Sequence, residues 1–172
     1  MNTKINIVLY EPEIAGNVGS IMRTCVAINA KLHLIEPLGF FLDERFIIRS
    51  SANYFEFLQY ESYADWNSFL SKNPHANLFF STRYGQKPPS AIDFTKSETP
   101  IYLVFGKESS GIPKTILQEH LNQCFRLPMS INTRSLNVAN VVCTVSYEVL
   151  RQLDYLDLSL NEIQKGKDYL QN

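Results

Sequence analysis

The chain has 172 residues, of which 45% are hydrophobic and 19% are charged. This composition excludes a disordered tail and a fibrous repeat, and the length predicts one globular domain over residues 1–172. The formal net charge is −1, from 16 Lys plus Arg against 17 Asp plus Glu, so no overall charge attracts nucleic acid or anionic lipid. Binding of RNA would therefore need a local basic patch.

Signals of membrane, secreted and metal proteins are also missing from the sequence. Its apolar runs, such as residues 5–10, fall well short of the ~20 residues of a membrane helix, so we expect a cytoplasmic protein without a membrane partner. Cys25, Cys124 and Cys143 are odd in number and widely spaced, which argues against disulfides and zinc. We therefore expect no metal cofactor.

Short apolar runs alternate with helical stretches along the chain. We predict buried strands at residues 5–9, 31–35, 78–81, 101–105 and 124–129. We predict helices at residues 17–29, 65–72, 113–121 and 137–153. Asn17, Asp65 and Asn137 are the expected caps, and Pro113 is the expected first residue of its helix. The alternation predicts an α/β fold with a mostly parallel sheet flanked by helices.

Two segments stand outside this alternation. Residues 84–100 contain one glycine and several prolines, and they are typical of a long irregular connection with a functional role or with mobility. The polar tail over residues 161–172 is expected to form a short peripheral helix or a frayed end.

The first candidate site is the segment 11–23, which runs from a strand into a helix. On a helical wheel Arg23 lies away from the apolar arc, beside Gly19, Ser20 and Ala27. Small neighbours let a phosphate or a partner backbone approach the guanidinium closely. The alternative is a solvated arginine on an exposed face.

Two further polar loops each follow a predicted strand and precede a predicted helix. Residues 105–113 place two glycines where open α/β sheets bind ligands, but Ile112-Pro113 occupies the place of the Lys-Ser or Lys-Thr of a phosphate loop. A nucleotide-like ligand is favoured over ATP or GTP hydrolysis, and a plain glycine turn is the alternative. Residues 127–140 offer donors and acceptors beyond what helix capping requires.

Taken in order, these loops resemble the three motifs of the SPOUT methyltransferases. The residues are N-x-G-x-x-x-R (17–23), F-G-K-E-S-S-G-I-P (105–113) and L-P-M followed by R-S-L-N (127–137). The segments N-I-V-L-Y-E-P-E-I and H-L-I-E-P-L-G-F are similar to one branch, the YibK-like tRNA wobble-nucleotide 2′-O-methyltransferases. The resemblance covers about residues 4–155.

The resemblance implies a deep trefoil knot in the C-terminal part of the chain and a cleft for S-adenosylmethionine, with S-adenosylhomocysteine as product. The implied cofactor contacts are Ser81, Thr82, Phe105, Gly106, Glu108, Leu127, Met129, Ser135 and Asn137. The implied catalytic residues are Arg23, Glu108, Ser135 and Asn137, and the implied RNA contacts are Asn17, Arg23 and Arg134. A guanidinium is a poor base, so we expect Arg23 to position the nucleotide and stabilise charge.

The implied reaction is 2′-O-methylation of the wobble cytidine or modified uridine of certain tRNAs, with leucine isoacceptors as the expected substrates. The implied assembly is a homodimer. Methylation of another tRNA or ribosomal RNA site and a non-catalytic RNA-binding or nucleotide-binding module are the alternatives. Two departures stand out: Ala15-Gly16 replaces prolines, which predicts a more flexible entry loop, and Ala139 replaces a common serine.

Overall fold

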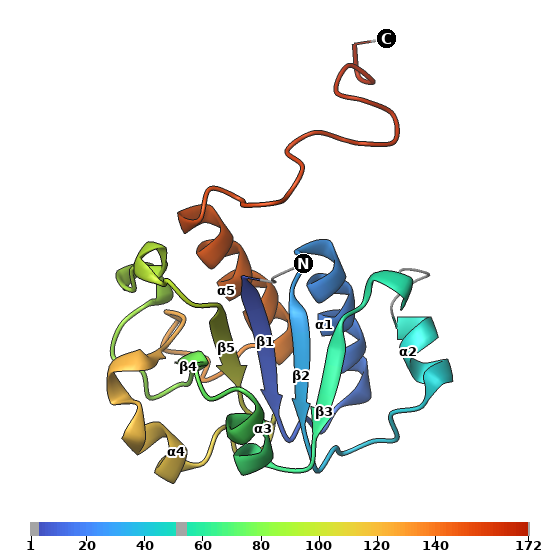
Figure 1. Cartoon of the computed structure of the whole chain (residues 1–172). Helices are drawn as coiled ribbons and strands as arrows, with labels where there is room; N and C mark the ends of the chain where they lie inside the picture. Colours follow the sequence, from blue (N-terminus) through green and yellow to red (C-terminus); the bar gives the residue numbers. More distant parts are fainter. Residues whose placement is uncertain (1–3, 51–54, 172) are drawn as a thin grey trace.

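A six-stranded, wholly parallel sheet forms the centre of the computed structural model, which describes residues 4–50 and 55–171. The strand order is β3-β2-β1-β5-β4-β6 (Figure 1). The strands are β1 (Ile5–Tyr10), β2 (Lys31–Ile35), β3 (Tyr60–Tyr63), β4 (Asn77–Ser81), β5 (Ile101–Phe105) and β6 (Cys124–Phe125). The α/β class and the mostly parallel sheet are confirmed.

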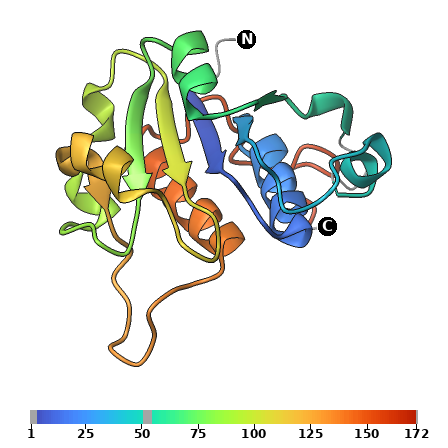
Figure 2. The ribbon, with the colours of Figure 1, turned by 90° about the horizontal axis from the view of Figure 1, so that it is seen from below.

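Helices cover both faces of the sheet, because β1 sends alternate side chains to two apolar clusters. Ile5, Ile7 and Leu9 join the cluster that contains the buried faces of α1 (Ala15–Ala27) and α5 (Val138–Gln152). Val8 joins the cluster of α3 (Trp66–Lys72) and α4 (Lys114–Glu119) on the other face. The views in Figures 1 and 2 show α1 and α5 side by side along one face of the sheet.

The helix predicted over residues 137–153 is confirmed. Val142, Val145 and Val149 are fully buried at 3-4 spacing, and the Asn137 side chain accepts hydrogen bonds from the amides of Ala139 and Asn140. Asp65 likewise caps α3 by accepting from the Ser68 amide.

The prediction that Asn17 caps the first helix is wrong. Helix α1 begins at Ala15, and Ile14 occupies the capping position without a side-chain hydrogen bond. Ala15 and Gly16 are therefore the first turn of a helix and not the flexible loop that the sequence predicted. Gly19, expected on the exposed face, is buried, whereas Ser20, Arg23 and Ala27 are exposed.

The strand β3 and the helix α2 (Glu44–Ser50) were not predicted. The strand predicted over residues 124–129 ends at Phe125, because the chain turns away from β4 there and the Arg126 amide bonds to the Lys87 carbonyl. The segment 84–100 is more ordered than expected, since it contains the short 3-10 helices η2 (Pro89–Ala91) and η3 (Phe94–Lys96). Phe94 is fully buried there.

The turn after β4 is tied to β6. The Thr82 amide donates to the Phe125 carbonyl at 3.0 Å, and the Arg126 amide donates to the Lys87 carbonyl at 2.9 Å. A Cβ atom at Gly85 would collide with the Phe125 backbone, so only glycine fits there. Segments 82–88 and 124–126 are thereby held together at the edge of the sheet.

The tail beyond α5 forms turns and runs away from the sheet (Figure 1). Residues 159–171 are exposed and contain no helix, so the peripheral helix offered as one expectation is not formed in the described part of the tail. Among residues 4–50 and 55–171 no helix is both long and apolar enough to cross a membrane.

Candidate active site

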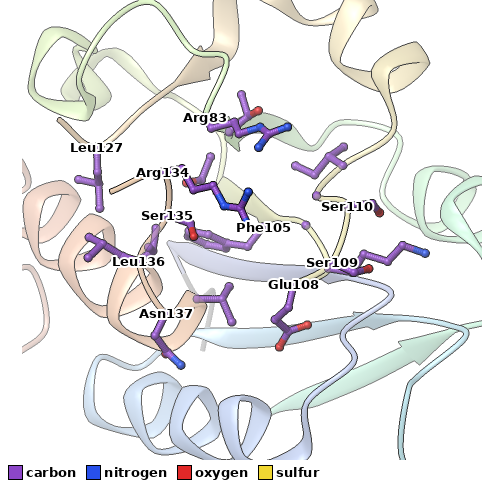
Figure 3. Close-up of a pocket in the computed structure, with 18 of the residues that line it drawn as sticks. Arg83, Phe105, Glu108, Ser109, Ser110, Leu127, Arg134, Ser135, Leu136 and Asn137 are labelled. Atoms are coloured by element: carbon purple, nitrogen blue, oxygen red, sulfur yellow. The ribbon is translucent and has the colours of Figure 1, made fainter. Parts of the chain in front are cut away.

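A cavity of about 700 Å³ lies at the carboxyl ends of β4, β5 and β6 (Figure 3). Ligands of open parallel sheets bind at this edge, where the loops after several strands meet. The walls come from residues 81–84 and 105–112, from Arg126, Leu127 and Met129, and from residues 134–138 with Val141. Ile14 and Asn17, at the start of α1, complete the lining.

All the positions expected to contact a cofactor line this one cavity. They are Ser81, Thr82, Phe105, Gly106, Glu108, Leu127, Met129, Ser135 and Asn137. Asn17 and Arg134, expected to contact RNA, also line it. Arg23 does not: its side chain is exposed on α1, outside the cavity.

The loop after β5 owes its shape to its glycines. A Cβ atom at Gly106 would collide with the backbone of Gly111 and Ile112. Gly111 has a φ of +75°, which favours glycine, and its amide donates to the Lys107 carbonyl at 2.8 Å. The loop therefore closes on itself while Ser109 and Ser110 remain exposed beside the cavity.

A chain of side-chain hydrogen bonds joins the three loops that the sequence singled out. Glu108 Oε1 accepts from Asn17 Nδ2 at 2.7 Å, and Asn17 Oδ1 accepts from Asn137 Nδ2 at 2.8 Å. The other oxygen, Glu108 Oε2, accepts from the Glu13 amide at 2.9 Å. Asn137 in turn caps α5. One hydrogen-bond network therefore connects the glycine loop, α1 and α5.

This network suggests a structural role for Asn17 and Glu108, which were expected to contact RNA and to take part in catalysis. Both carboxylate oxygens of Glu108 already have donors, and Asn17 is only 8% exposed. Glu108 is partly buried, and polar side chains paired in this way hold neighbouring segments together. Asn17 and Glu108 therefore shape the wall of the cavity.

Two acidic residues of the 11–23 segment, for which the motifs predicted no role, strengthen the same junction. Lys107 Nζ lies 2.8 Å from Glu11 Oε2, and Glu13 accepts from both the amide and the hydroxyl of Ser109, each at 2.8 Å. The hydrogen bond from Lys107 lowers the pKa of Glu11, and those from Ser109 lower the pKa of Glu13. The sequence feature that could have indicated this contact is the acidic segment Glu11-Pro12-Glu13, directly after an apolar strand.

The opposite wall of the cavity is basic. Figure 3 shows Arg83 and Arg134 on one side and Glu108 and Asn137 on the other. Arg126 also lines the cavity. In the described ranges no group of three or more His, Cys, Asp or Glu side chains could hold a metal ion.

A glycine loop, a polar network and a basic wall thus meet at the carboxyl edge of a parallel α/β sheet, the edge at which proteins of this class bind nucleotide-like ligands. Residues 4–147 match the model of the SpoU rRNA Methylase family. The chain belongs to this family.

Individual relatives are similar over almost their whole length. The tRNA (cytidine(34)-2′-O)-methyltransferase of Escherichia coli K12 is 40% identical over 152 residues, which are 88% of this chain and 95% of that protein. A Bacillus anthracis protein, provisionally described as an RNA methyltransferase, has a crystal structure with a TM-score of 0.86 at 40% identity, covering 92% of this chain and 99% of its own.

A third relative was solved in work on 2′-OH methylation of C/U34 on tRNA. Its TM-score is 0.79 at 32% identity, and the match covers 87% of this chain and 96% of that chain. These likenesses confirm the methyltransferase family that the three motifs predicted.

Proposed function

We propose that this protein transfers a methyl group from S-adenosylmethionine to the ribose 2′-oxygen of the wobble nucleotide in tRNA. The observation that carries this proposal is that the family's cofactor positions, separated by up to 56 residues in the chain, line one cavity. Family membership and the names of the relatives support the reaction and the nucleotide. Leucine isoacceptors are the substrates that we propose, on the resemblance alone.

The cavity fits the proposed cofactor in size and in chemistry. Pockets for small ligands have volumes of about 300–1,000 Å³ and combine apolar walls with a few polar groups. Leu127, Met129 and Val138 supply apolar surface, while the loop around Gly106 brings backbone amides and carbonyls to the wall. When bound, the cofactor would supply an electrophilic methyl group on a sulfonium, and no metal is needed.

The protein's own residues would hold and orient the reactants. Ser135 lines the cavity and carries a hydroxyl that can donate to or accept from a ribose hydroxyl or the cofactor. Glu108 and Asn137, expected as catalytic residues, act in this proposal as positioning residues through Asn17. Arg23 would position the nucleotide's phosphate.

Because Arg23 lies outside the cavity of its own chain, we propose that it completes the site of a second copy. This arrangement makes the active enzyme a homodimer. We also propose, on the resemblance, that the C-terminal part of the chain threads through a loop to form a trefoil knot. The hydrogen bonds that join the 82–88 turn to Phe125 and Arg126 are compatible with such a packing of loops. The enzyme would act in the cytoplasm, where tRNA is found.

The test is methylation of unfractionated tRNA by the purified protein with methyl-labelled S-adenosylmethionine, followed by mapping of the labelled ribose. We expect label on the wobble nucleotide, with leucine tRNAs enriched among the labelled species. The Gly106→Val variant is the control that should show no transfer. Label confined to another loop or to ribosomal RNA would contradict the substrate, and absence of any transfer would contradict the reaction.

A further inference from the structure

A second groove, of about 710 Å³, opens directly beside the cofactor cavity. One wall is the turn after β4, residues 83–88. The other is the chain that leaves β6, from which Arg126, residues 128–131, Thr133 and Arg134 line the groove. The two hollows share Arg83, Tyr84, Arg126, Met129 and Arg134. The groove and the cofactor cavity are therefore adjacent, and these shared side chains lie at the boundary between them.

The groove concentrates positive charge in a chain whose net charge is −1. Arg83, Lys87, Arg126 and Arg134 line it, and no acidic residue does. Within the described part of the chain none of these four forms a salt bridge, whereas Lys31, Lys72, Lys96, Lys107 and Arg151 do. Arg83 does donate a hydrogen bond to the Tyr84 hydroxyl. The groove thus has the positive charge of an anion site, and no ion pair neutralises it among the described residues.

Arg126 gives the most specific indication that a ligand binds here. Its Nε atom is buried and has no hydrogen-bond partner among the described residues. Buried polar groups are nearly always paired, so an orphaned guanidinium donor between two hollows indicates a ligand that accepts hydrogen bonds. Phosphate oxygens accept such bonds with good geometry.

An aromatic side chain lies at the boundary between the groove and the cavity. Tyr84 is 67% exposed, and the Arg83 guanidinium lies 4.8 Å from its ring centroid. Exposed large aromatic side chains beside arginine are the platforms on which single-stranded bases stack. The contact with Arg83 also limits the orientations of the Tyr84 ring before a ligand binds.

The walls of the groove are fixed to each other. The Lys87 carbonyl bonds to the Arg126 amide, and Gly85 packs against the Phe125 backbone. The backbones of Lys87 and Arg126 are therefore held next to each other, so both residues project from one rigid junction.

From these observations we infer that the groove binds the phosphodiester backbone of single-stranded RNA next to the nucleotide that is methylated, with Tyr84 stacking on a flanking base. This inference rests on the proposed function, because it extends the same site from the reacting ribose to its neighbours. The ligand class is single-stranded RNA, since a duplex hides the base faces that Tyr84 would contact.

The experiment is binding of a fluorescently labelled anticodon stem-loop RNA in the presence of S-adenosylhomocysteine, measured by anisotropy over a series of salt concentrations. Lys87→Gln is the main variant, because Lys87 lines the groove and not the cofactor cavity. We expect about tenfold weaker binding. We also expect the slope of log K against log salt to become shallower by about 0.7, the loss of one phosphate contact on a single strand.

The matched control is Lys72→Gln on α3, which also removes one positive charge. Lys72 pairs with Glu61 of β3, the edge strand opposite β6, so its loss should leave both the affinity and the salt slope unchanged. Tyr84→Ala should weaken binding about tenfold or more, and Tyr84→Phe, which keeps the ring, should bind nearly as well as the wild type.

The outcomes separate the groove from the proposed function. If Lys87→Gln and Tyr84→Ala bind the stem-loop with wild-type affinity and slope while the wild type methylates tRNA, the groove inference is overturned and the function stands. If Lys87→Gln instead loses affinity for S-adenosylhomocysteine, the groove belongs to the cofactor site and the inference is also wrong. If the wild type neither binds nor methylates RNA, the proposed function itself fails.

Discussion

Asn17 shows how one side chain can connect three distant parts of a site. It donates to Glu108 and accepts from Asn137, and it is buried on α1. The sequence identified Asn17 through its motif but assigned it to capping or RNA. Those roles are common for an asparagine near a helix start, whereas its actual partners lie 91 and 120 residues away. A local sequence pattern cannot predict contacts between residues so far apart in the chain.

We predict that Asn17→Ala destabilises the protein by about 1–3 kcal/mol, because it leaves Glu108 Oε1 and Asn137 Nδ2 without partners. Urea denaturation measures the free energy of unfolding. The control is Ser20→Ala on the exposed side of the same helix, which should change that free energy by less than about 0.5 kcal/mol. Equal effects of the two substitutions would refute a structural role for Asn17.

The buried side chain of His33 on β2 should make the free energy of unfolding depend on pH. It is 1% exposed; its Nδ1 lies 2.8 Å from the Tyr63 hydroxyl and its Nε2 lies 3.0 Å from Asn6 Oδ1. Burial, aided by Lys31, lowers the pKa of His33 from 6.5 to about 4. The unfolded chain therefore binds a proton first as the pH falls, so His33's contribution to stability is complete above pH 6.5 and is lost between pH 6.5 and 4.

We expect the free energy of unfolding to fall as the pH is lowered from 7.5 to 5, and to fall less steeply in His33→Gln, which cannot titrate. Urea denaturation at several pH values measures both slopes. Carboxylates with lowered pKa, such as Glu61 between Lys31 and Lys72, add their own loss at lower pH in both proteins. Parallel slopes for the two proteins would show that His33 titrates alike in the folded and unfolded states.

At the scale of elements, the sequence located the strands that are buried on both faces of the sheet. β1, β2 and β5 are almost continuously buried because helices cover both faces of the sheet, and their predicted bounds agree within one residue. β3 has the sequence YESY with only Tyr63 buried, so its pairing at the edge leaves no apolar signal. Leu127 and Met129 extended a predicted strand, but these side chains face the cavity.

The glycine loop after β5 gives a prediction about cofactor binding. Gly106→Val would drive side-chain atoms into the backbone of Gly111 and Ile112, so the loop must move. We expect affinity for S-adenosylhomocysteine, measured by calorimetry, to fall at least tenfold. Gly16→Ala is the control, because a Cβ atom there meets nothing within 4 Å and alanine favours the first turn of α1. Wild-type affinity in Gly106→Val would contradict the placement of the cofactor.

At the scale of the whole molecule, the position of Arg23 predicts that two chains share each site. We expect Arg23→Ala to lose methyl transfer by about 100-fold or more while it still binds S-adenosylhomocysteine. Arg151→Ala, at the exposed end of α5, is the matched control and should remain active. Sedimentation should show a dimer, and an active monomer at micromolar concentration would contradict the shared site.

Mixing two inactive variants tests the sharing directly. In a heterodimer of Arg23→Ala and Gly106→Val, the intact cavity of the first subunit would receive Arg23 from the second. If the subunits pair at random, half of the dimers carry one working site, so co-expression should restore about a quarter of wild-type activity. If Arg23 serves its own subunit, no heterodimer has a complete site and the mixture stays inactive.

The chain of hydrogen bonds from Glu108 through Asn17 to Asn137 has a consequence for biosynthesis. Its members come from the first helix, the middle of the chain and the start of the last helix. A chain still being translated has no complete cavity until Asn137 and α5 have left the ribosome. S-adenosylmethionine would therefore bind only after Asn137 and α5 have joined the fold, and it would stabilise the chain from that point on.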